Sequence, residues 1–242
     1  MNHAVISEVL RTISQIERAT SPQGVLERLH ALLMQHGLRD ILITRLPVAH
    51  DRQWHREILC NGWSAEWHAR YNQRGHYFYD PCAGTSRRTG RAFFWSELER
   101  GDMDPRGRLV MDEAREFGML DGACVPIHTP LCGPAVVTAA GDNIDLSPSA
   151  LPMVEVACVQ AYRKVCDLDY NSPRQHRPSL TSREREILQW SSEGKGTEDI
   201  ACILGISRHT VETHIRNIRE KLDVLNVTHA VAEALRRQEI QI

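Results

Sequence analysis

The chain has 242 residues, of which 42% are hydrophobic and 25% are charged, and its formal net charge at pH 7 is −2. A chain of this size and composition can form one large or two ordinary globular domains, and its charge gives no sign of a polyanionic partner. No apolar run approaches the roughly 20 residues of a membrane span, and the opening MNHAVISEVL has no signal-peptide pattern, so we expect a cytoplasmic protein without a membrane segment.

Residues 1–168 alternate between helical and strand-like patterns. Apolar residues at helical spacing, with Ser-Pro or Asp-Pro at three of the starts, predict helices within residues 6–16, 22–36, 105–117 and 148–165. Runs rich in β-branched and apolar residues predict strands at residues 40–46, 56–60, 123–130 and 134–141, the last two as an antiparallel pair. We therefore expect an α+β domain in which helices flank a sheet.

The rest of the chain has a different texture. Residues 169–179 are polar and contain two prolines, which predicts a linker, and residues 180–242 show no strand signal. Thr181 and Glu184 form a capping box, and Gly205 lies in a tight turn before a capped helix. We expect an all-α domain of four helices, which begin near Thr181, Thr197, Ser207 and Thr228.

The short helix, the turn with glycine and the longer capped helix are typical of a helix-turn-helix. On a wheel of about 100° per residue, the helix after Ser207 gathers its apolar residues in one stripe, Val211, Ile215, Ile218 and Leu222. Its other side presents polar side chains, which are His209, Glu212, Thr213, Arg216 and Glu220. A charged helix taken alone is more often a solvated surface helix. The capped three-helix pattern favours one that lies in the major groove of DNA.

Charge is unevenly distributed over this domain. Residues 180–242 contain nine basic and ten acidic residues, a net charge of −1, whereas residues 208–221 alone carry +2. One copy is therefore expected to bind DNA weakly, and two copies on a two-fold axis to read an inverted repeat.

The stretch LTSREREILQWSSEGKGTEDIACILGISRHTVETHIRNIREKL resembles the helix-turn-helix of the LuxR/FixJ type. The matching residues are Leu180-Thr181, Arg183-Glu184, Leu188, Gly194-Lys195, Ile200-Ala201, Leu204, Ser207, Thr210-Val211, His214, Asn217 and Lys221-Leu222. The resemblance implies that the helix after Ser207 enters the major groove and that the last helix pairs two copies. It implies base-edge contacts by Glu212, Thr213 and Arg216. It also implies phosphate contacts by Lys195, Thr197, Arg208 and Thr210.

The stretch WSAEWHARYNQRGHYFYDP gathers aromatic rings around one acidic residue. Trp63, Trp67 and Tyr71 recur every four residues on one helical face, and Asp80 follows them. Such rings are most often core residues, and the aspartate would then cap a helix begun by Pro81. However, a buried indole N–H, a phenol and a carboxylate all need partners, which a ligand with two carbonyls and one N–H would supply.

This stretch resembles the acyl-homoserine lactone-binding domain of LuxR-type quorum-sensing receptors. The residues at the family's spacing are Trp67, Tyr71, Asp80-Pro81, Trp95, Gly122 and Thr138. The resemblance implies that Trp67 donates to the lactone carbonyl and that Asp80 accepts the amide N–H in a charge-assisted hydrogen bond. It also implies that Tyr71 and Thr138 reach the acyl carbonyl and that Trp95 walls the lactone end.

Trp63 completes the predicted ligand-binding set. It stands where members of the family often have tyrosine, and Cys82 stands where some have a hydroxyl residue. Both differences remove an oxygen contact, which favours an unsubstituted, short, branched or aryl acyl group.

The two resemblances together cover nearly the whole chain. They imply a transcriptional regulator that responds to an acyl-homoserine lactone, binds an inverted-repeat operator on double-stranded DNA as a homodimer and contacts RNA polymerase. No cofactor is expected. Activation and repression both stay open, as does a regulator that answers another organism's signal, a non-lactone signal or no ligand.

Other classes of protein fit the sequence less well. Cys124 and His128 share one face of a predicted strand and could form a nucleophile–base pair, but no acid or glycine-rich turn accompanies them. We expect them to pack the sheet. A phosphorylated response regulator would need several acids near residue 10, where ISEVLRTISQI has one.

A metal site is not expected either. The seven cysteines are scattered and never form a C-x-x-C pair, which predicts reduced thiols. A group of histidines lacks ligand spacing and is expected at the surface, namely His50, His55, His68 and His76.

Overall fold

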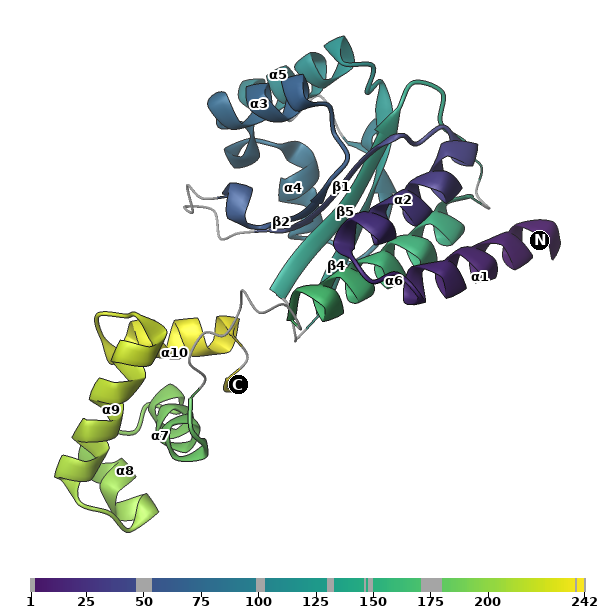
Figure 1. Cartoon of the computed structure of the whole chain (residues 1–242). Helices are drawn as coiled ribbons and strands as arrows, with labels where there is room; N and C mark the ends of the chain where they lie inside the picture. The colour runs from purple at the N-terminus through teal and green to yellow at the C-terminus, as the bar shows by residue number, and fades with distance from the viewer. Residues whose placement is uncertain are drawn as a thin grey trace. The chain divides into compact units, whose positions relative to one another are not determined.

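The structure is a computed structural model of the whole chain (Figure 1), and it describes residues 3–46, 54–98, 103–129, 133–145, 147, 150–170, 180–237 and 239–241. These residues form two compact units, one before residue 171 and one after residue 179. Across the described ranges, no helix combines the length and the apolar character needed to cross a bilayer. Of the predicted linker, only residues 169 and 170 are described, and both are helical.

The first unit is built on a five-stranded antiparallel sheet in the order β2-β1-β5-β4-β3. The strands are β1 (Asp40–Arg45), β2 (Ile58–Asn61), β3 (Phe93–Phe94), β4 (Asp121–Thr129) and β5 (Gly133–Gly141). The four longer strands match the four predicted runs within two residues at each end. β3 was not predicted, because two residues are too few to show an alternating pattern.

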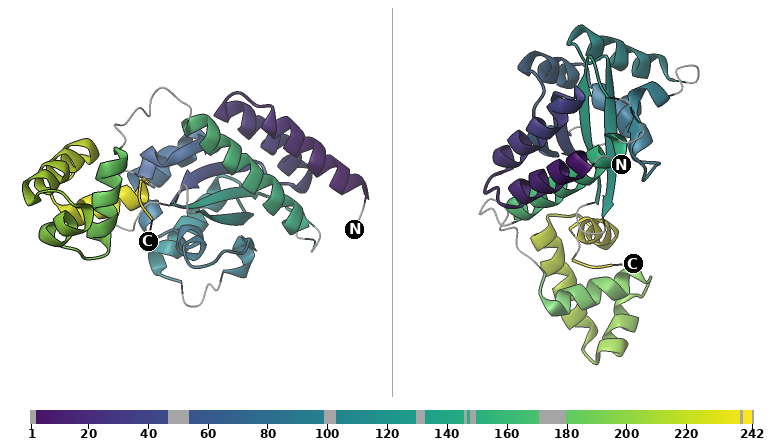
Figure 2. Two further views of the ribbon diagram at one scale, coloured as in Figure 1. Left: turned by 90° about the horizontal axis from the view of Figure 1, so that it is seen from below. Right: turned by 90° about the vertical axis from the view of Figure 1, so that its right-hand side faces the viewer.

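Helices cover both faces of this sheet, as predicted (Figures 1 and 2). On one face pack α1 (His3–Glu17), α2 (Pro22–Leu33) and α6 (Ala150–Tyr170), and on the other lie α3 (Ala65–Gln73), α4 (Pro81–Ser86) and α5 (Pro105–Glu116). The side chains of a strand alternate between its faces, so Leu42 joins the α3–α5 side while Ile41 and Ile43 are buried on the other. Four short 3-10 helices complete the unit: η1 (Met34–His36), η2 (Trp54–Arg56), η3 (His76–Phe78) and η4 (Trp95–Glu97).

Polar caps start the helices where the sequence predicts them. Ser21 Oγ accepts the Gly24 N–H at 3.1 Å, and Asp104 accepts the Arg106 N–H at 2.7 Å. α6 runs on to Tyr170, past its predicted end, while its predicted start at Pro148 lies outside the described residues.

The second unit contains the four predicted helices. They are α7 (Ser182–Ser192), α8 (Thr197–Leu204), α9 (Arg208–Leu222) and α10 (Val227–Arg236). Thr181 and Glu184 form the predicted capping box, and Ser207 caps α9 by accepting the Thr210 N–H at 3.1 Å. Gly205 ends α8 with a positive φ of 63°, so the turn before α9 is the tight one that the sequence predicts.

A partly buried ion pair joins two helices of this second unit. The Glu184 side chain is 4% exposed and accepts hydrogen bonds from Lys221 Nζ and from the Thr181 N–H, each at 2.7 Å. Burial alone would raise the pKa of the Glu184 carboxyl, but these bonds bring its pKa below the usual value. The pair ties the start of α7 to the end of α9.

Glu184→Gln is expected to destabilise the second unit by about 1–2 kcal/mol, because a neutral amide binds Lys221 less strongly than a carboxylate does. Faster hydrogen exchange in α7 and α9 of the full chain would report this loss. The depressed pKa means that the stabilisation is present above the unfolded-state pKa of about 4.5 and disappears as the pH falls through the folded-state pKa. Glu186→Gln is the control, because that residue is exposed and its ion pair with Arg183 lies at the surface.

Candidate functional site

A cavity lies in the first unit between the sheet and the layer of α3, α4 and α5. Its solvent-accessible volume is about 40 Å³, and it continues into space that is open to solvent. Its walls include all six residues predicted to bind a ligand: Trp63, Trp67, Tyr71, Asp80, Trp95 and Thr138. An apolar lining with a few convergent polar groups is typical of a small-molecule site.

One end of the cavity is an aromatic cluster. Trp67 and Tyr71, one turn apart on α3, are 2% and 3% exposed, and their rings meet edge to face with centroids 5.6 Å apart. Trp63 contacts Tyr71 with centroids 5.1 Å apart. Trp54 and Tyr77, which the sequence did not single out, stack on each other beside Tyr71. These rings pack against Leu42, so this end of the cavity lies at the start of β1.

Asp80 has two roles in the structure. Its Oδ1 accepts the N–H groups of Cys82 at 2.7 Å and Ala83 at 3.4 Å, so it caps α4 as the alternative to ligand binding predicts. Its Oδ2 accepts the Tyr71 hydroxyl at 2.7 Å. A carboxylate offers about four acceptor positions, so these bonds leave capacity for one further N–H.

The protonation of Tyr71 follows from this environment. Burial, followed by the charge and the hydrogen bond of Asp80, raises the pKa of the Tyr71 hydroxyl well above its usual range. The phenol therefore stays protonated and donates to Asp80. Its oxygen still has lone pairs, but its single proton is already engaged.

The indole N–H of Trp67 is the third polar group at this end of the cavity. The side chain is almost completely buried and lines the cavity, and its N–H is not among the fully buried polar atoms that lack a partner in the described residues. The indole N–H can therefore donate to an acceptor that enters the cavity.

The wall formed by β4 and β5 carries sulfur and hydroxyl groups. Trp95 Nε1 donates to Cys124 Sγ at 3.3 Å, and that thiol donates to Thr138 Oγ1 at 3.5 Å. The Trp95 ring lies on Gly122, where a β-carbon would come within 2.7 Å of it, so only glycine leaves the ring its place. Burial, followed by contact with Cys124, raises the pKa of the Cys82 thiol well above its usual value. A protonated thiol is a poor nucleophile.

Contacts in this part of the protein bear on the predicted places of three residues, Cys124, His128 and His76. His128 Nε2 donates to the Ser86 carbonyl at 2.9 Å, so it is a packing partner of α4, while Cys124 is engaged with Trp95 and Thr138. The expectation that His76 lies at the surface is wrong. It is 4% exposed and 3.0 Å from the buried carboxylate of Glu113, behind the rings of Trp67 and Tyr71.

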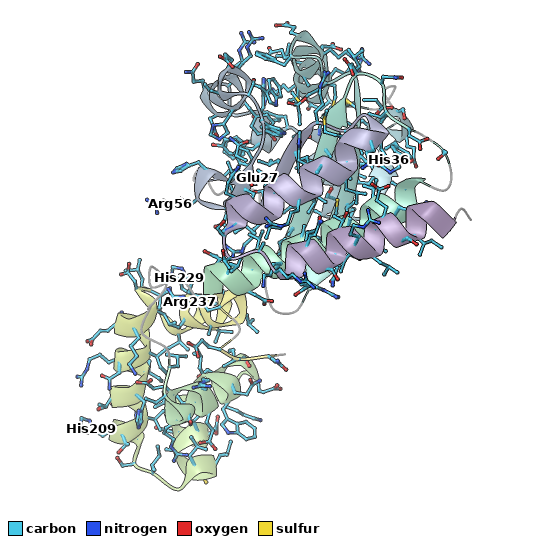
Figure 3. The ribbon with its side chains drawn as sticks, turned by 45° about the vertical axis from the view of Figure 1, so that its right-hand side comes forward. Glu27, His36, Arg56, His209, His229 and Arg237 are labelled. Atoms are coloured by element: carbon cyan, nitrogen blue, oxygen red, sulfur yellow. The ribbon has the colours of Figure 1, made fainter. Side chains whose placement is uncertain are left out.

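The second unit presents the face predicted to meet DNA. Val211, Ile218 and Leu222 are buried on the inner side of α9, while Glu212 and Arg216 are exposed. Figure 3 shows the exposed His209 projecting outward from this helix. Thr213 is half-buried, and its hydroxyl donates to the His209 carbonyl at 3.0 Å. The predicted base-edge residues therefore share one accessible side.

Of the residues predicted to contact DNA phosphates, Arg208 already forms ion pairs within the protein. Arg208 Nη1 lies 2.6 Å from Glu198 and its Nε 2.8 Å from Glu212. These bonds and charges, Glu212 first, raise the pKa of the Arg208 guanidinium. Lys195 is exposed before α8. Thr210 Oγ1 lies 2.8 Å from Ser207 Oγ. Arg208 is thus held between two carboxylates in the protein without DNA.

The fold and the cavity define a sensor domain joined to a helix-turn-helix domain, and comparisons agree with this class. Residues 21–165 match the family described as "Autoinducer binding domain", and residues 178–234 match "Bacterial regulatory proteins, luxR family". The crystal structure of SdiA from Escherichia coli has the same fold, with a TM-score of 0.76 and 19% identity over 98% of this chain and 99% of that one.

Curated relatives are similar over most of their length. The quorum sensing-dependent transcriptional regulator RpaR of Rhodopseudomonas palustris is 33% identical over 93% of this chain and 92% of its own. The transcriptional activator BjaR1 of Bradyrhizobium diazoefficiens is 33% identical over 88% of this chain and 87% of its own. The chain belongs to the LuxR family of quorum-sensing transcriptional regulators, which are DNA-binding proteins and not enzymes.

Proposed function

We propose that the signal is an N-acyl-homoserine lactone, and that its binding controls a homodimer on an inverted-repeat operator in the cytoplasm. The observation that carries the proposal is that an indole N–H and a carboxylate with a spare acceptor position line one cavity. Trp67 supplies the donor and Asp80 the acceptor. An acyl-homoserine lactone has a ring carbonyl for the first and an amide N–H for the second.

Other residues of the cavity wall could contact the rest of an acyl-homoserine lactone. The Thr138 hydroxyl accepts from Cys124 and keeps its own proton for the acyl carbonyl, whereas the Tyr71 hydroxyl would first have to turn its proton away from Asp80. Trp63 and Trp95 then act as walls around the head group. The tail would follow Leu42, Thr44 and Leu46 along the sheet, where burial of each CH₂ contributes about 0.8 kcal/mol. Ligand binding to the folded state would stabilise the domain by mass action.

On the DNA side, we assign base-edge contacts to Glu212, Thr213 and Arg216. Phosphate contacts are assigned to Lys195, Thr197, Arg208 and Thr210. The N-termini of α8 and α9 add unpaired N–H groups that favour anions. The near-neutral charge of the domain means that one copy binds weakly, which supports a two-fold dimer on a palindromic site. A bound regulator of this kind would act on RNA polymerase.

The direct test is to identify what the protein retains. The full chain is expressed in an organism that makes no acyl-homoserine lactones. The culture receives an organic extract of the organism from which the protein comes, and the purified protein is then analysed by mass spectrometry. Retention of one lactone at about one molecule per chain is the expected result. Retention of a molecule without a lactone, or a regulator equally active without extract, would reject this signal class.

A ligand-independent regulator is the second candidate, and one contact favours it. The bond between Tyr71 and Asp80, with the cap on α4, already satisfies two of the three polar groups without a guest. Such a protein would fold and bind its operator in medium free of lactones. The same expression experiment without extract distinguishes the two candidates.

Glu198→Gln is expected to strengthen DNA binding severalfold at about 0.1 M salt. Without this carboxylate, Arg208 keeps only Glu212 as a partner and can turn to a phosphate. The measurement is operator affinity as a function of salt concentration, which should also give a steeper slope. Glu193→Gln makes the same charge change at an exposed position after α7 and serves as control. Equal effects of both substitutions would mean that only net charge matters.

A further inference from the structure

A buried polar pair lies behind the aromatic end of the cavity. His76 Nε2 is 3.0 Å from Glu113 Oε2, and the two side chains are 4% and 5% exposed. Neither is among the residues that line the cavity. Burying a carboxylate costs free energy even when it is paired, so this pair is a costly way to fill space.

His76 contacts three of the residues proposed to bind the head group. Between centroids, its ring lies 5.9 Å from the ring of Trp67 and 5.7 Å from that of Tyr71, which it meets edge to face. Its carbonyl oxygen accepts the backbone N–H of Asp80 at 2.9 Å. One residue therefore supports both rings and the backbone of the acceptor.

A turn in the chain brings His76 to this place. Gly75 has a positive φ of 63°, a conformation that favours glycine, and it turns the chain back between α3 and η3. The imidazole then packs against two residues of the helix that has just ended, Trp67 and Tyr71.

Glu113 holds the other side of the imidazole. It forms an ion pair with Arg74 at the end of α3 and, as a carboxylate, only accepts hydrogen bonds, so the His76 Nε2 carries the proton and donates it. Glu113 lies on α5, which contributes Val110 and Ala114 to the cavity wall. The pair therefore joins the residues of the head-group site to a helix of the cavity wall.

The direction of an indole N–H depends on how its ring is held. A hydrogen bond weakens steeply when donor and acceptor are misaligned, and binding sites keep their contact groups within about 0.5 Å of the productive geometry through a supporting layer of hydrogen bonds. An apolar side chain in place of His76 would fill the same space without fixing the angle of the rings in front of it.

We propose that His76 and Glu113 are positioning residues of the ligand site. Their hydrogen bond holds Trp67, Tyr71 and the Asp80 backbone in the arrangement that binds the head group, and neither residue touches the ligand. This inference rests on the proposed acyl-homoserine lactone function and adds the residues that give the site its selectivity for a ring carbonyl.

Competition between two head groups tests this role. Each lactone is paired with the cyclopentylamide of the same acid, which keeps the amide and the tail but lacks the ring carbonyl. The tails are butanoyl, hexanoyl, octanoyl, dodecanoyl and phenylpropanoyl, and variants are compared with the tail that the natural chain retains best. The full chain is expressed in an organism that makes no lactones and receives equal amounts of both members, and mass spectrometry gives the retained ratio of lactone to cyclopentylamide.

This ratio separates positioning from stability. It is counted among retained molecules, so a variant that yields less folded protein still reports the preference of its site, and uptake by the cells cancels between variants. The natural chain should retain the lactone in about tenfold excess or more. Trp67→Phe removes the indole N–H and should bring the ratio to about one.

The positioning residues are expected to act through the same ratio. Glu113→Gln and His76→Phe should each lower it about threefold or more. His76→Gln should keep most of it, because an amide N–H can take the place of the imidazole N–H, whereas His76→Phe keeps a ring and loses the donor. Glu116→Gln is the matched control and should leave the ratio unchanged. Glu116 also lies on α5 and pairs with an arginine of α3, Arg70, but it is 61% exposed.

The outcomes separate this inference from the proposed function. If Trp67→Phe lowers the ratio while Glu113→Gln and His76→Phe keep it, the pair only packs the core, so its positioning role is overturned and the lactone receptor stands. If His76→Phe gives no soluble protein, Glu113→Gln decides. If the natural chain retains no lactone at all, the proposed function fails and the inference fails with it.

Discussion

Replacing Asp80 by asparagine is expected to raise the lactone concentration for a half-maximal transcriptional response by about a hundredfold. The carboxylate has one acceptor position left after binding Tyr71, Cys82 and Ala83. Asparagine has one acceptor oxygen fewer and brings an NH₂ group, which would face the ligand N–H donor to donor. Asparagine caps helices about as well as aspartate, so α4 should remain in place.

The chain contains a matched control for this substitution. Asp104 precedes Pro105 as Asp80 precedes Pro81, and it caps α5 by accepting the Arg106 N–H at 2.7 Å, but it does not line the cavity. Asp104→Asn should therefore leave the dose–response curve where it is. If the two variants shifted the curve equally, the loss would come from helix capping and Asp80 would have no role as a ligand acceptor.

Replacing Arg216 by alanine is expected to weaken operator binding by about a hundredfold, while the amount of lactone retained per chain stays constant. A side chain that reads a base edge contributes about 1–3 kcal/mol, and a homodimer loses two of them. Arg216 is exposed on the outer side of α9 and has no ion pair among the described residues, so its guanidinium is available without breaking a contact. Operator affinity at fixed salt is the measurement.

Arg219→Ala separates position from charge. It removes the same charge three residues later on α9, where the side chain is also exposed, but it is not among the predicted base-edge residues. A tenfold smaller effect on the operator is expected, with equal effects of the two variants on unrelated DNA. Loss of operator affinity to the same degree in both would show a general electrostatic contribution and remove Arg216 from the base-reading set.

The second unit could be predicted in detail because its signals are local. The cap at Thr181 with Glu184 and the cap at Ser207 each depend on residues three positions apart, and both occur as predicted. The buried stripe of α9 follows from helical periodicity alone. The contact between Arg208 and Glu198 could not be predicted in the same way, because it joins two helices whose crossing depends on the whole core.

The cavity shows where sequence patterns stop being informative. Trp67, Tyr71 and Asp80 could be found because they lie within fourteen residues of one another and carry the family's spacing. Arg87 lies in the polar run TSRRTGR, which reads as surface, and only the packing of α4 on β4 and β5 turns its side chain inward. His76 was placed at the surface for the same reason, since its partner Glu113 is 37 residues away.

The double use of Asp80 constrains how receptors of this kind can diverge. The same carboxylate holds the start of α4 and offers the acceptor for the proposed guest, so few replacements would preserve both duties. Apolar positions along the rest of the wall, such as Leu46 and Val136, would contact a guest through packing alone and have no such double role. Receptors that evolve to bind a different signal molecule should therefore keep this aspartate and change residues along the rest of the cavity wall.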